Sequence, residues 1–244
     1  MELARKLLSS LFPSRCILCR QTIIEAVTGP HVEICLPCYQ ALPKNDSTCI
    51  RCALPLPDDI DGNVLCGRCV NKRPHYDYSR SLFIYEDEVV SLIHQLKFGE
   101  KICYARSIGE MLLTVVNNEV LPDQGRPDCI IPVPLHNKRL RRRGYNQSTE
   151  ISRVMAKKLA IPIAYDAVVR TRHTKAQTDL KAKDRQKNIK GAFSVIDVKK
   201  YSHVLITDDV VTTGSTVNEL AKVLKDKGVE RVGVLSVARA PLKN

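Results

Sequence analysis

Alternating apolar and polar segments predict a sheet with flanking helices from residue 76 onward. Four short apolar runs, typical of buried strands, cover residues 81–85, 128–133, 204–207 and 231–238. Segments with apolar positions at helical spacing cover residues 86–98, 102–116, 146–159 and 217–227. Strands that alternate with helices predict an α/β fold in which helices cover both faces of a parallel sheet. Ligands of such folds lie at the carboxyl ends of the strands.

Residues 1–75 show a different pattern. This segment has few core-forming residues and many prolines, so burial alone cannot stabilise it. Its start places Leu3, Leu7 and Leu11 at helical spacing, with Arg5 and Lys6 between them, which predicts an amphipathic helix rather than a signal peptide. No apolar run reaches the ~18 residues of a membrane span, so we expect none. We therefore divide the chain into a small module, residues 1–75, and an α/β domain, residues 76–244.

Eight of the ten cysteines form four Cys-x-x-Cys pairs in the small module: Cys16/Cys19, Cys35/Cys38, Cys49/Cys52 and Cys66/Cys69. Two such pairs can hold one Zn²⁺ ion in a closed tetrahedral site, and without a secretion signal metal is favoured over disulfides. We predict two structural zinc sites whose metal supplies folding free energy. The spacing leaves two connectivities open, namely successive sites or a cross-brace that joins the first pair to the third and the second to the fourth.

The other two cysteines, Cys103 and Cys129, lie within apolar patterns. A free cysteine in such a pattern usually packs as a small hydrophobic residue. We therefore predict that both are buried.

The net charge of +12 is concentrated in one segment. Between His136 and Lys190 there are 16 Lys and Arg residues and 4 Asp and Glu residues, whereas the charges in the rest of the chain cancel. Such an excess indicates a polyanionic partner, either pyrophosphate or nucleic acid. Because aromatic residues make up only 5% of the chain and Trp is absent, stacking on bases is limited mainly to Tyr145 and Phe193. We therefore expect modest, sequence-independent affinity for nucleic acid.

The stretch from Val204 to Thr216 has the composition of a phosphate site. A predicted strand is followed by two acids and a hydroxyl-rich turn, namely Asp208, Asp209, Thr212, Thr213, Gly214, Ser215 and Thr216. Hydroxyls and backbone N–H groups at a helix N-terminus cradle phosphate, and the glycine lets the backbone approach closely. Two carboxylates can accept hydrogen bonds from the vicinal hydroxyls of a ribose. The stretch therefore predicts a site for a ribose 5-phosphate.

This stretch resembles the phosphoribosyl pyrophosphate (PRPP) loop of type I phosphoribosyltransferases. Three further motifs precede it in order: PVPLH…RLRRRGYNQ at 132–147, R-T-R-x-T-x-x-Q at 170–177 and R-x-x-N-x-x-G-A-F at 185–193. Behind a cysteine module, the set resembles the ComF family of phosphoribosyltransferase-like competence proteins over nearly the whole chain. We therefore expect a type I phosphoribosyltransferase-like sheet.

The resemblance implies a division of the site. PRPP is expected to bind with its 5-phosphate on residues 212–216, its ribose hydroxyls on Asp208 and Asp209, and Mg²⁺ beside its pyrophosphate. The resemblance also implies that a loop beginning at Val133 and Pro134 binds pyrophosphate and that a mobile basic loop, about residues 171–185, closes over it. The candidate residues of these two loops are Val133, Pro134, Arg143, Gly144, Asn146, Gln147, Arg172, Lys175, Gln177 and Arg185.

The resemblance also implies a role in natural transformation, in which single-stranded DNA is taken up. We favour a cytoplasmic PRPP-binding protein that contacts this DNA, with DNA-uptake proteins as partners that could hold it at the inner face of the membrane. Three classes of function remain open: a phosphoribosyltransferase whose acceptor no stretch identifies, a single-strand-binding adaptor with a regulatory PRPP pocket, and an interaction platform. The alternative is a conventional phosphoribosyltransferase of nucleotide salvage or synthesis with a small-molecule acceptor.

Overall fold

A computed structural model describes residues 14–24, 32–57, 64–98, 101–172 and 187–242. The amphipathic helix predicted at the start of the chain falls outside these residues, and so does most of the predicted basic loop at 171–185. Among the described residues, no helix combines the length and apolarity needed to cross a membrane.

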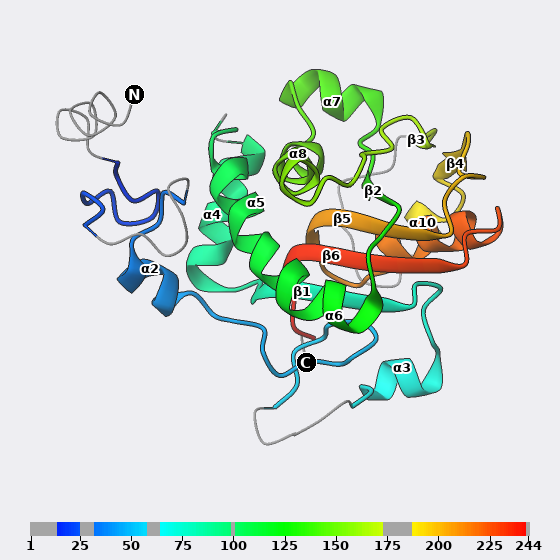
Figure 1. Cartoon of the computed structure of the whole chain (residues 1–244), viewed down its shortest axis with the longest axis horizontal. Coiled ribbons are helices and arrows are strands. Elements are labelled where there is room, and N and C mark those ends of the chain that lie inside the picture. Colours follow the sequence, from blue (N-terminus) through cyan, green and yellow to red (C-terminus); the bar gives the residue numbers. More distant parts are fainter. Residues whose placement is uncertain (1–13, 25–31, 58–63, 99–100, 173–186, 243–244) are drawn as a thin grey trace.

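Four strands form one parallel sheet in the order β1 (Tyr78–Ile84), β6 (Arg231–Arg239), β5 (His203–Val211) and β2 (Cys129–Pro132) (Figure 1). This confirms the predicted parallel sheet. Strand β5 is longer than predicted, because it stays paired with β6 as far as the Val211–Arg239 position. Asp208 and Asp209 therefore lie within the strand near its carboxyl end rather than after it.

Helices cover both faces of the sheet, as the sequence predicts. Figure 1 shows α4 (Asp87–Phe98), α5 (Tyr104–Val115) and α8 (Gln147–Leu159) grouped to one side of the sheet and α10 (Ser215–Lys225) on the other. Successive strand residues feed the two cores alternately: Leu205 lies in the core with α4, α5 and α8, and Ile206 lies in the core with α10. This alternation is the two-residue period of a strand that is buried on both faces.

Several short elements have no clear sequence pattern. They are α2 (Leu36–Ala41), α3 (Gly67–Asn71), a π-helical turn (Val116–Val120), α6 (Leu121–Gln124), α7 (Asn137–Arg143) and the antiparallel pair β3 (Val168–Arg170) and β4 (Phe193–Val195). Helix α7 occupies the basic stretch that the sequence suggests is a loop. The ring of His136 caps it by accepting the N–H of Lys138, and Gly144 ends it in the left-handed region with φ 83°.

The cysteine-rich segment wraps around the β1 edge of the sheet. Lys44 pairs with Phe83 in an antiparallel bridge, and the N–H of Ile84 donates to the carbonyl of Pro43 at 2.9 Å. This contact covers an otherwise open strand edge. Cysteines before this crossing pack into the core with α5, and cysteines after it pack into the core with α10. The segment thus contributes to both cores, and its boundary at residue 75 stays a prediction.

The two cysteines outside the pairs differ. Cys129 is fully buried in β2, as predicted. Cys103 is exposed just before α5, so the prediction that it is buried is wrong. The apolar period of α5 begins with Tyr104 and Ala105, which face the core, and Cys103 precedes this first buried turn.

Candidate functional site

The eight paired cysteines gather into two groups of four. Cys16, Cys19, Cys35 and Cys38 form one group, and Cys49, Cys52, Cys66 and Cys69 form the second, with all Sγ atoms of each group within 4.8 Å of one another. The two sites are therefore successive along the chain. The cross-brace, the alternative connectivity, is excluded by this grouping.

The geometry of each group fits Zn²⁺. With Zn–S bonds of about 2.3 Å, the sulfurs of a tetrahedral site lie about 3.8 Å apart. The Sγ atoms of Cys19 and Cys35 are 3.8 Å apart, and those of Cys52 and Cys66 are 3.7 Å apart. These distances are far too long for disulfides. The residues therefore form two structural zinc sites of a double zinc ribbon.

The surroundings of the second group favour a thiolate at Cys49 and oppose one at Cys52. Burial acts to raise the pKa of Cys49, but backbone N–H groups of Cys66, Cys52 and Arg51 outweigh it and lower that pKa to about 7. Burial and the charge of Cys49 in turn raise the pKa of Cys52 to about 11. Buried thiolates that repel one another are stabilised by a cation between them, which is the role of the metal.

Arg239, at the end of β6, connects the second cysteine group to the predicted phosphate loop. Its side chain is almost completely buried. Its Nε donates to the carbonyl of Cys52 at 3.0 Å, and its Nη1 donates to the carbonyls of Val211, Thr212 and Ala240. One guanidinium thus fixes both the Cys-x-x-Cys turn and the start of the loop.

A second arginine spans the same boundary. Arg68, between Cys66 and Cys69 on α3, donates to the carbonyl of Thr213 at 3.4 Å. The zinc module and the phosphate loop are therefore in direct contact, although 145 residues separate these two partners in the sequence.

The carboxylate of Asp209 is buried and has partners on two helices. One of its oxygens lies 2.9 Å from Nζ of Lys97, on α4, and also accepts the N–H of Val210. The other oxygen accepts the side-chain amide of Gln147, at the start of α8. Protein groups thus occupy both oxygens of Asp209.

Asp208 is placed differently. Its Oδ1 accepts the hydroxyl of Ser148 at 3.3 Å and the N–H of Asp209 at 2.9 Å. Its Oδ2 has no hydrogen-bond donor among the described residues. Burial and the adjacent charge of Asp209 raise the pKa of Asp208 to about 7, although Lys97 acts in the opposite direction. Asp208 is therefore the carboxyl group with an oxygen left for a ligand.

The predicted phosphate loop, Thr212, Thr213, Gly214, Ser215 and Thr216, connects β5 to α10 and is partly exposed. Gly214 is the N-cap of α10 in the left-handed region, with φ 77°. Thr213 and Ser215 share a hydroxyl hydrogen bond of 2.8 Å, and the Thr213 hydroxyl also accepts the N–H of Ser215. The first N–H groups of a helix have no intrahelical partner, so this turn presents donors at a helix N-terminus.

The loop after β2 lies beside the acidic pair, as predicted. Val133, which Pro134 follows, donates its N–H to the carbonyl of Thr207 on β5, and its own carbonyl accepts the side-chain amide of Asn146 at 3.0 Å. Asn146 also caps α8 by accepting the N–H of Ser148. This contact places the first turn of α8, with Gln147 and Ser148, against the two aspartates.

Of the remaining predicted loop residues, Arg143 and Arg172 lie within the described part of the chain. Arg143, at the end of α7, donates to the side-chain oxygen of Gln147, which itself bonds Asp209. Arg172 is exposed and donates to the carbonyl of Lys190 at 2.8 Å. Lys175, Gln177 and Arg185 lie outside the described residues.

Neither aromatic residue singled out by the sequence has the open ring of a stacking platform. Phe193 is buried, with the guanidinium carbon of Arg170 5.7 Å from its ring centre. Tyr145 is half-buried, and its hydroxyl donates to the carbonyl of Leu96. Phe193 therefore offers no face for base stacking, and the ring of Tyr145 is only partly exposed.

Three site residues are not among the sequence-predicted candidates, although Arg170 opens the R-T-R-x-T-x-x-Q motif. Lys97 ends an ordinary amphipathic helix, Arg239 ends an apolar strand, and Arg170 lies on a short strand of a separate two-stranded sheet. Burial and the charge of Arg139 lower the pKa of Arg170 to about 10, whereas Asp208 raises it, which places Arg170 within the field of the acidic pair.

Comparisons with known proteins agree with this geometry. The double zinc ribbon domain family matches residues 7–70, and the phosphoribosyl transferase domain family matches residues 146–243. Competence protein F of Haemophilus influenzae is 35% identical over 235 residues, which cover 95% of this chain and 99% of that protein. The DNA utilization protein YhgH of Escherichia coli K12 is 35% identical over 228 residues, which cover 93% of this chain and 97% of that protein. A hypoxanthine/guanine phosphoribosyltransferase of Methanosarcina barkeri is 34% identical over 87 residues, which cover 36% of this chain and 44% of that protein.

The zinc connectivity can be tested with two double variants. Cys49→Ser with Cys69→Ser alters only the second group, so this variant should retain the zinc ion of the first. Cys16→Ser with Cys49→Ser alters both groups and should retain neither ion. Zinc released from desalted protein by denaturation measures the content. A cross-brace would reverse the two results, because Cys49 and Cys69 would then belong to different sites and Cys16 and Cys49 to the same one.

Replacing Arg239 tests the link between the zinc module and the loop. Arg239→Met leaves buried carbonyls without donors, so we expect the free energy of unfolding to fall by about 3 kcal/mol or more. Arg231→Met is the matched control, because Arg231 is partly exposed and donates to Gln124 across a surface contact. Its effect should stay below about 1 kcal/mol. Equal denaturation midpoints for the two variants would contradict the assigned role of Arg239.

The raised pKa of Asp208 predicts a pH dependence of stability. An unfolded chain releases the Asp208 proton near about pH 4, whereas the folded chain keeps it up to about pH 7. The folded state therefore binds more protons across this range, and stability should fall as pH rises through it. Asp208→Asn should show a shallower decline from about pH 5 to about pH 8 in thermal unfolding. Parallel curves for the wild type and the variant would show that burial of Asp208 carries no such cost.

Proposed function

Because the chain belongs to the ComF family, which includes competence protein F and the DNA utilization protein YhgH, we propose that it binds PRPP and handles single-stranded DNA during natural transformation. The double zinc ribbon and the phosphoribosyltransferase-like domain are the two parts that such a protein combines. In this proposal it acts in the cytoplasm, and DNA-uptake proteins bring it to the inner face of the membrane.

One observation carries the PRPP assignment. In the part of the chain that the structure describes, Asp208 has an oxygen without a donor, on the strand that leads directly into the hydroxyl-rich turn at the N-terminus of α10. An acceptor for a ribose hydroxyl and donors for a phosphate are thus joined by a few residues of backbone. Asp209 has both oxygens occupied by Lys97, Val210 and Gln147. We assign it the role of holding the edge of the site in place, with Asp208 contacting the ribose.

In this proposal the chain has only to stabilise charge on the sugar ring and on the leaving pyrophosphate. Loss of pyrophosphate from PRPP leaves positive charge on the sugar ring, and in this proposal the carboxylates of Asp208 and Asp209 stabilise it. Carboxylate oxygens are also ligands that Mg²⁺ prefers, so the site fits PRPP with its metal ion. Arg143 and Arg172, together with Lys175 and Arg185, are our candidates for neutralising the pyrophosphate.

A conventional phosphoribosyltransferase is the second candidate. It is favoured by the partial similarity to the hypoxanthine/guanine phosphoribosyltransferase of Methanosarcina barkeri. That match covers 36% of this chain, whereas competence protein F matches 95% of it, so we rank this function second. Release of pyrophosphate from PRPP only when a free nucleobase is added would reverse the ranking.

The PRPP site is tested by the double variant Asp208→Asn with Asp209→Asn. A charge-assisted hydrogen bond contributes about 1.5–3 kcal/mol, so the loss of the one that Asp208 makes to the ribose should weaken Mg²⁺–PRPP binding at least about tenfold, and Asp209→Asn removes the charge that holds the edge of the site. Isothermal titration calorimetry measures the affinity, and circular dichroism checks that the fold is kept.

The matched control is Asp197→Asn with Asp226→Asn, which removes the same charge from exposed positions outside the site. This control should bind PRPP as the wild type does. If the site variant and the control bound equally well, PRPP would have to bind elsewhere or not through carboxylates.

A further inference from the structure

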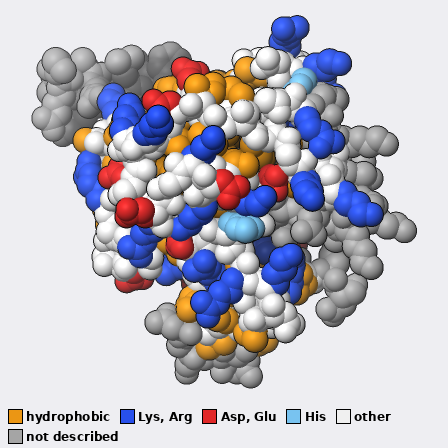
Figure 2. Space-filling view, turned by 90° about the vertical axis from the view of Figure 1, so that its right-hand side faces the viewer, with side chains coloured by type: hydrophobic (Ala, Val, Ile, Leu, Met, Phe, Trp, Pro, Cys, Tyr) orange, Lys and Arg blue, Asp and Glu red, His pale blue; other side chains and the backbone are white. Residues whose placement is uncertain are grey.

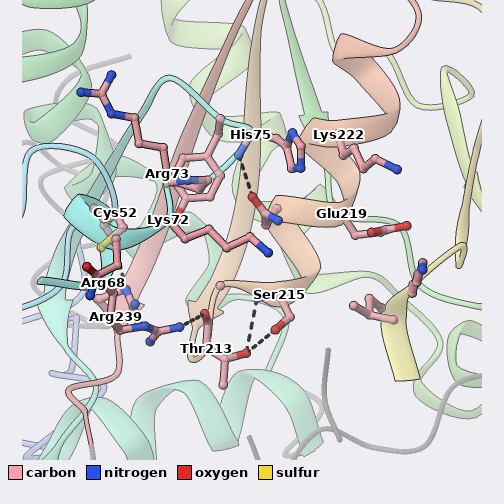
Figure 3. Close-up of a pocket in the computed structure, with 18 residues that line it drawn as sticks. Cys52, Arg68, Lys72, Arg73, His75, Thr213, Ser215, Glu219, Lys222 and Arg239 are labelled. Atoms are coloured by element: carbon pink, nitrogen blue, oxygen red, sulfur yellow. Dashed lines mark hydrogen bonds between the residues drawn. The ribbon is translucent and has the colours of Figure 1, made fainter. Parts of the chain in front are cut away.

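A second pocket lies behind the phosphate loop. It has a volume of about 580 Å³, and Figure 3 shows it between the second cysteine group and α10. Its walls are α3, the segment 71–76, the turn 213–215 and the outward face of α10. Asp208 and Asp209 do not line it, because their contacts are with α4 and α8 on the other side of the sheet. The pocket is thus distinct from the ribose site and shares only the turn with it.

The lining of this pocket is strongly basic. Its exposed cations come from the zinc module, the segment before β4 and α10, namely Arg68, Lys72, Arg73, Lys190 and Lys222. Among the described lining residues the single carboxylate is Glu219, and it already accepts the N–H of Gly191 at 2.6 Å. Figure 2 shows many Lys and Arg side chains, with fewer Asp and Glu side chains between them, on this side of the molecule.

Most of these cations are not neutralised by the protein. Within the described part of the chain, Lys72 and Lys190 have no carboxylate within ion-pair distance. Lys222 reaches Asp226 only at 4.0 Å, on the exposed surface. Figure 3 shows Lys72 extending across the pocket toward α10. Positive groups that converge on a recess without counter-charges favour an anionic ligand.

The distribution of basic side chains along the pocket indicates a ligand with more than one phosphate. Ser215 and Lys222 lie seven positions apart on α10, which corresponds to about 10 Å along the helix axis. Basic groups therefore follow the pocket from the turn at the helix N-terminus to its third turn. Tyr76 is the only Tyr, Phe or Trp among the described lining residues, and it is buried. Recognition must then rest on phosphates rather than on stacked bases.

We propose that this pocket binds successive phosphates of single-stranded DNA, which rests on the DNA-handling role in the proposed function and gives that role a location. The zinc module supplies one wall through Arg68, Lys72 and Arg73, and α10 supplies the opposite wall through Lys222. The binding is sequence-independent and steeply salt-dependent, because each neutralised phosphate releases counterions.

The test is fluorescence anisotropy of a labelled oligo(dT) over a salt series with the full chain. The pocket variant is Lys72→Gln, Lys190→Gln and Lys222→Gln combined. Each lost phosphate contact lowers the slope of log affinity against log salt by about 0.7 for a single strand, so the slope should fall by about 2. Affinity at low salt should fall at least about tenfold. The matched control, Lys157→Gln with Lys199→Gln and Lys227→Gln, removes the same charge from exposed residues outside the pocket and should change affinity less than about twofold.

The outcomes separate this inference from the proposed function. Equal losses of affinity for oligo(dT) in the pocket variant and the control would show that the pocket is not the DNA site. DNA binding would then rest on the overall positive charge of the protein. A wild type that does not bind oligo(dT) at low salt would remove the DNA part of the proposed function itself. Inorganic tripolyphosphate is the competing source of adjacent phosphates. If it bound the wild type but not the pocket variant, while oligo(dT) bound both equally, the pocket would belong to a free polyphosphate rather than to a strand.

Discussion

The hydrogen bonds of Arg239 are the constraint on which the arrangement of this molecule depends. A buried guanidinium is stable only if its donors are satisfied, and here carbonyls from three segments satisfy them. One is the Cys52 carbonyl in a zinc-binding turn, and the others end β5 and β6. The parallel pairing of β5 with β6 brings Val211 and Arg239 side by side, and the second cysteine group closes over them. Arg239 therefore ties the phosphate loop to the second cysteine group.

Unlike Arg239, whose buried charge is compensated by hydrogen bonds, the acidic pair of Asp208 and Asp209 destabilises the folded state. Two adjacent carboxylates in a largely buried position repel each other, and among the described residues only Lys97 lies close enough to Asp209 to form an ion pair. The arrangement raises the pKa of Asp208 and lowers stability at neutral pH. An arrangement that costs stability is expected where function needs it, since a protein selected only for folding has no reason to keep both acids. The oxygen of Asp208 that has no donor among the described residues agrees with this view.

The sequence predicts those parts of the molecule whose signal is local. Helices and strands with a full apolar period, the four Cys-x-x-Cys pairs and the acidic and hydroxyl-rich stretch can all be read without the fold. The pairing of the cysteine groups, the approach of Lys97 to Asp209 and the burial of Arg239 depend on which segments the sheet brings together, and no short pattern records that. Helix α7 is a different case, because its seven residues contain one apolar position and form no amphipathic period. Its signals were the basic last turn and Gly144 at its end.

The zinc module also explains how a strand could be held next to a nucleotide site. A phosphate loop alone offers a few donors at one helix end, which suits a single phosphate group. The second cysteine group adds a rigid wall on the far side of the same loop, and Arg68 contacts that loop directly at Thr213. A structural zinc site suits this task because it fixes short, poorly packed turns that burial alone would not order. In our proposals the same turn at residues 213–215 borders two anion sites of different character. The one beside Asp208 would bind a ribose phosphate, and the one beside Lys72 would bind a chain of phosphates.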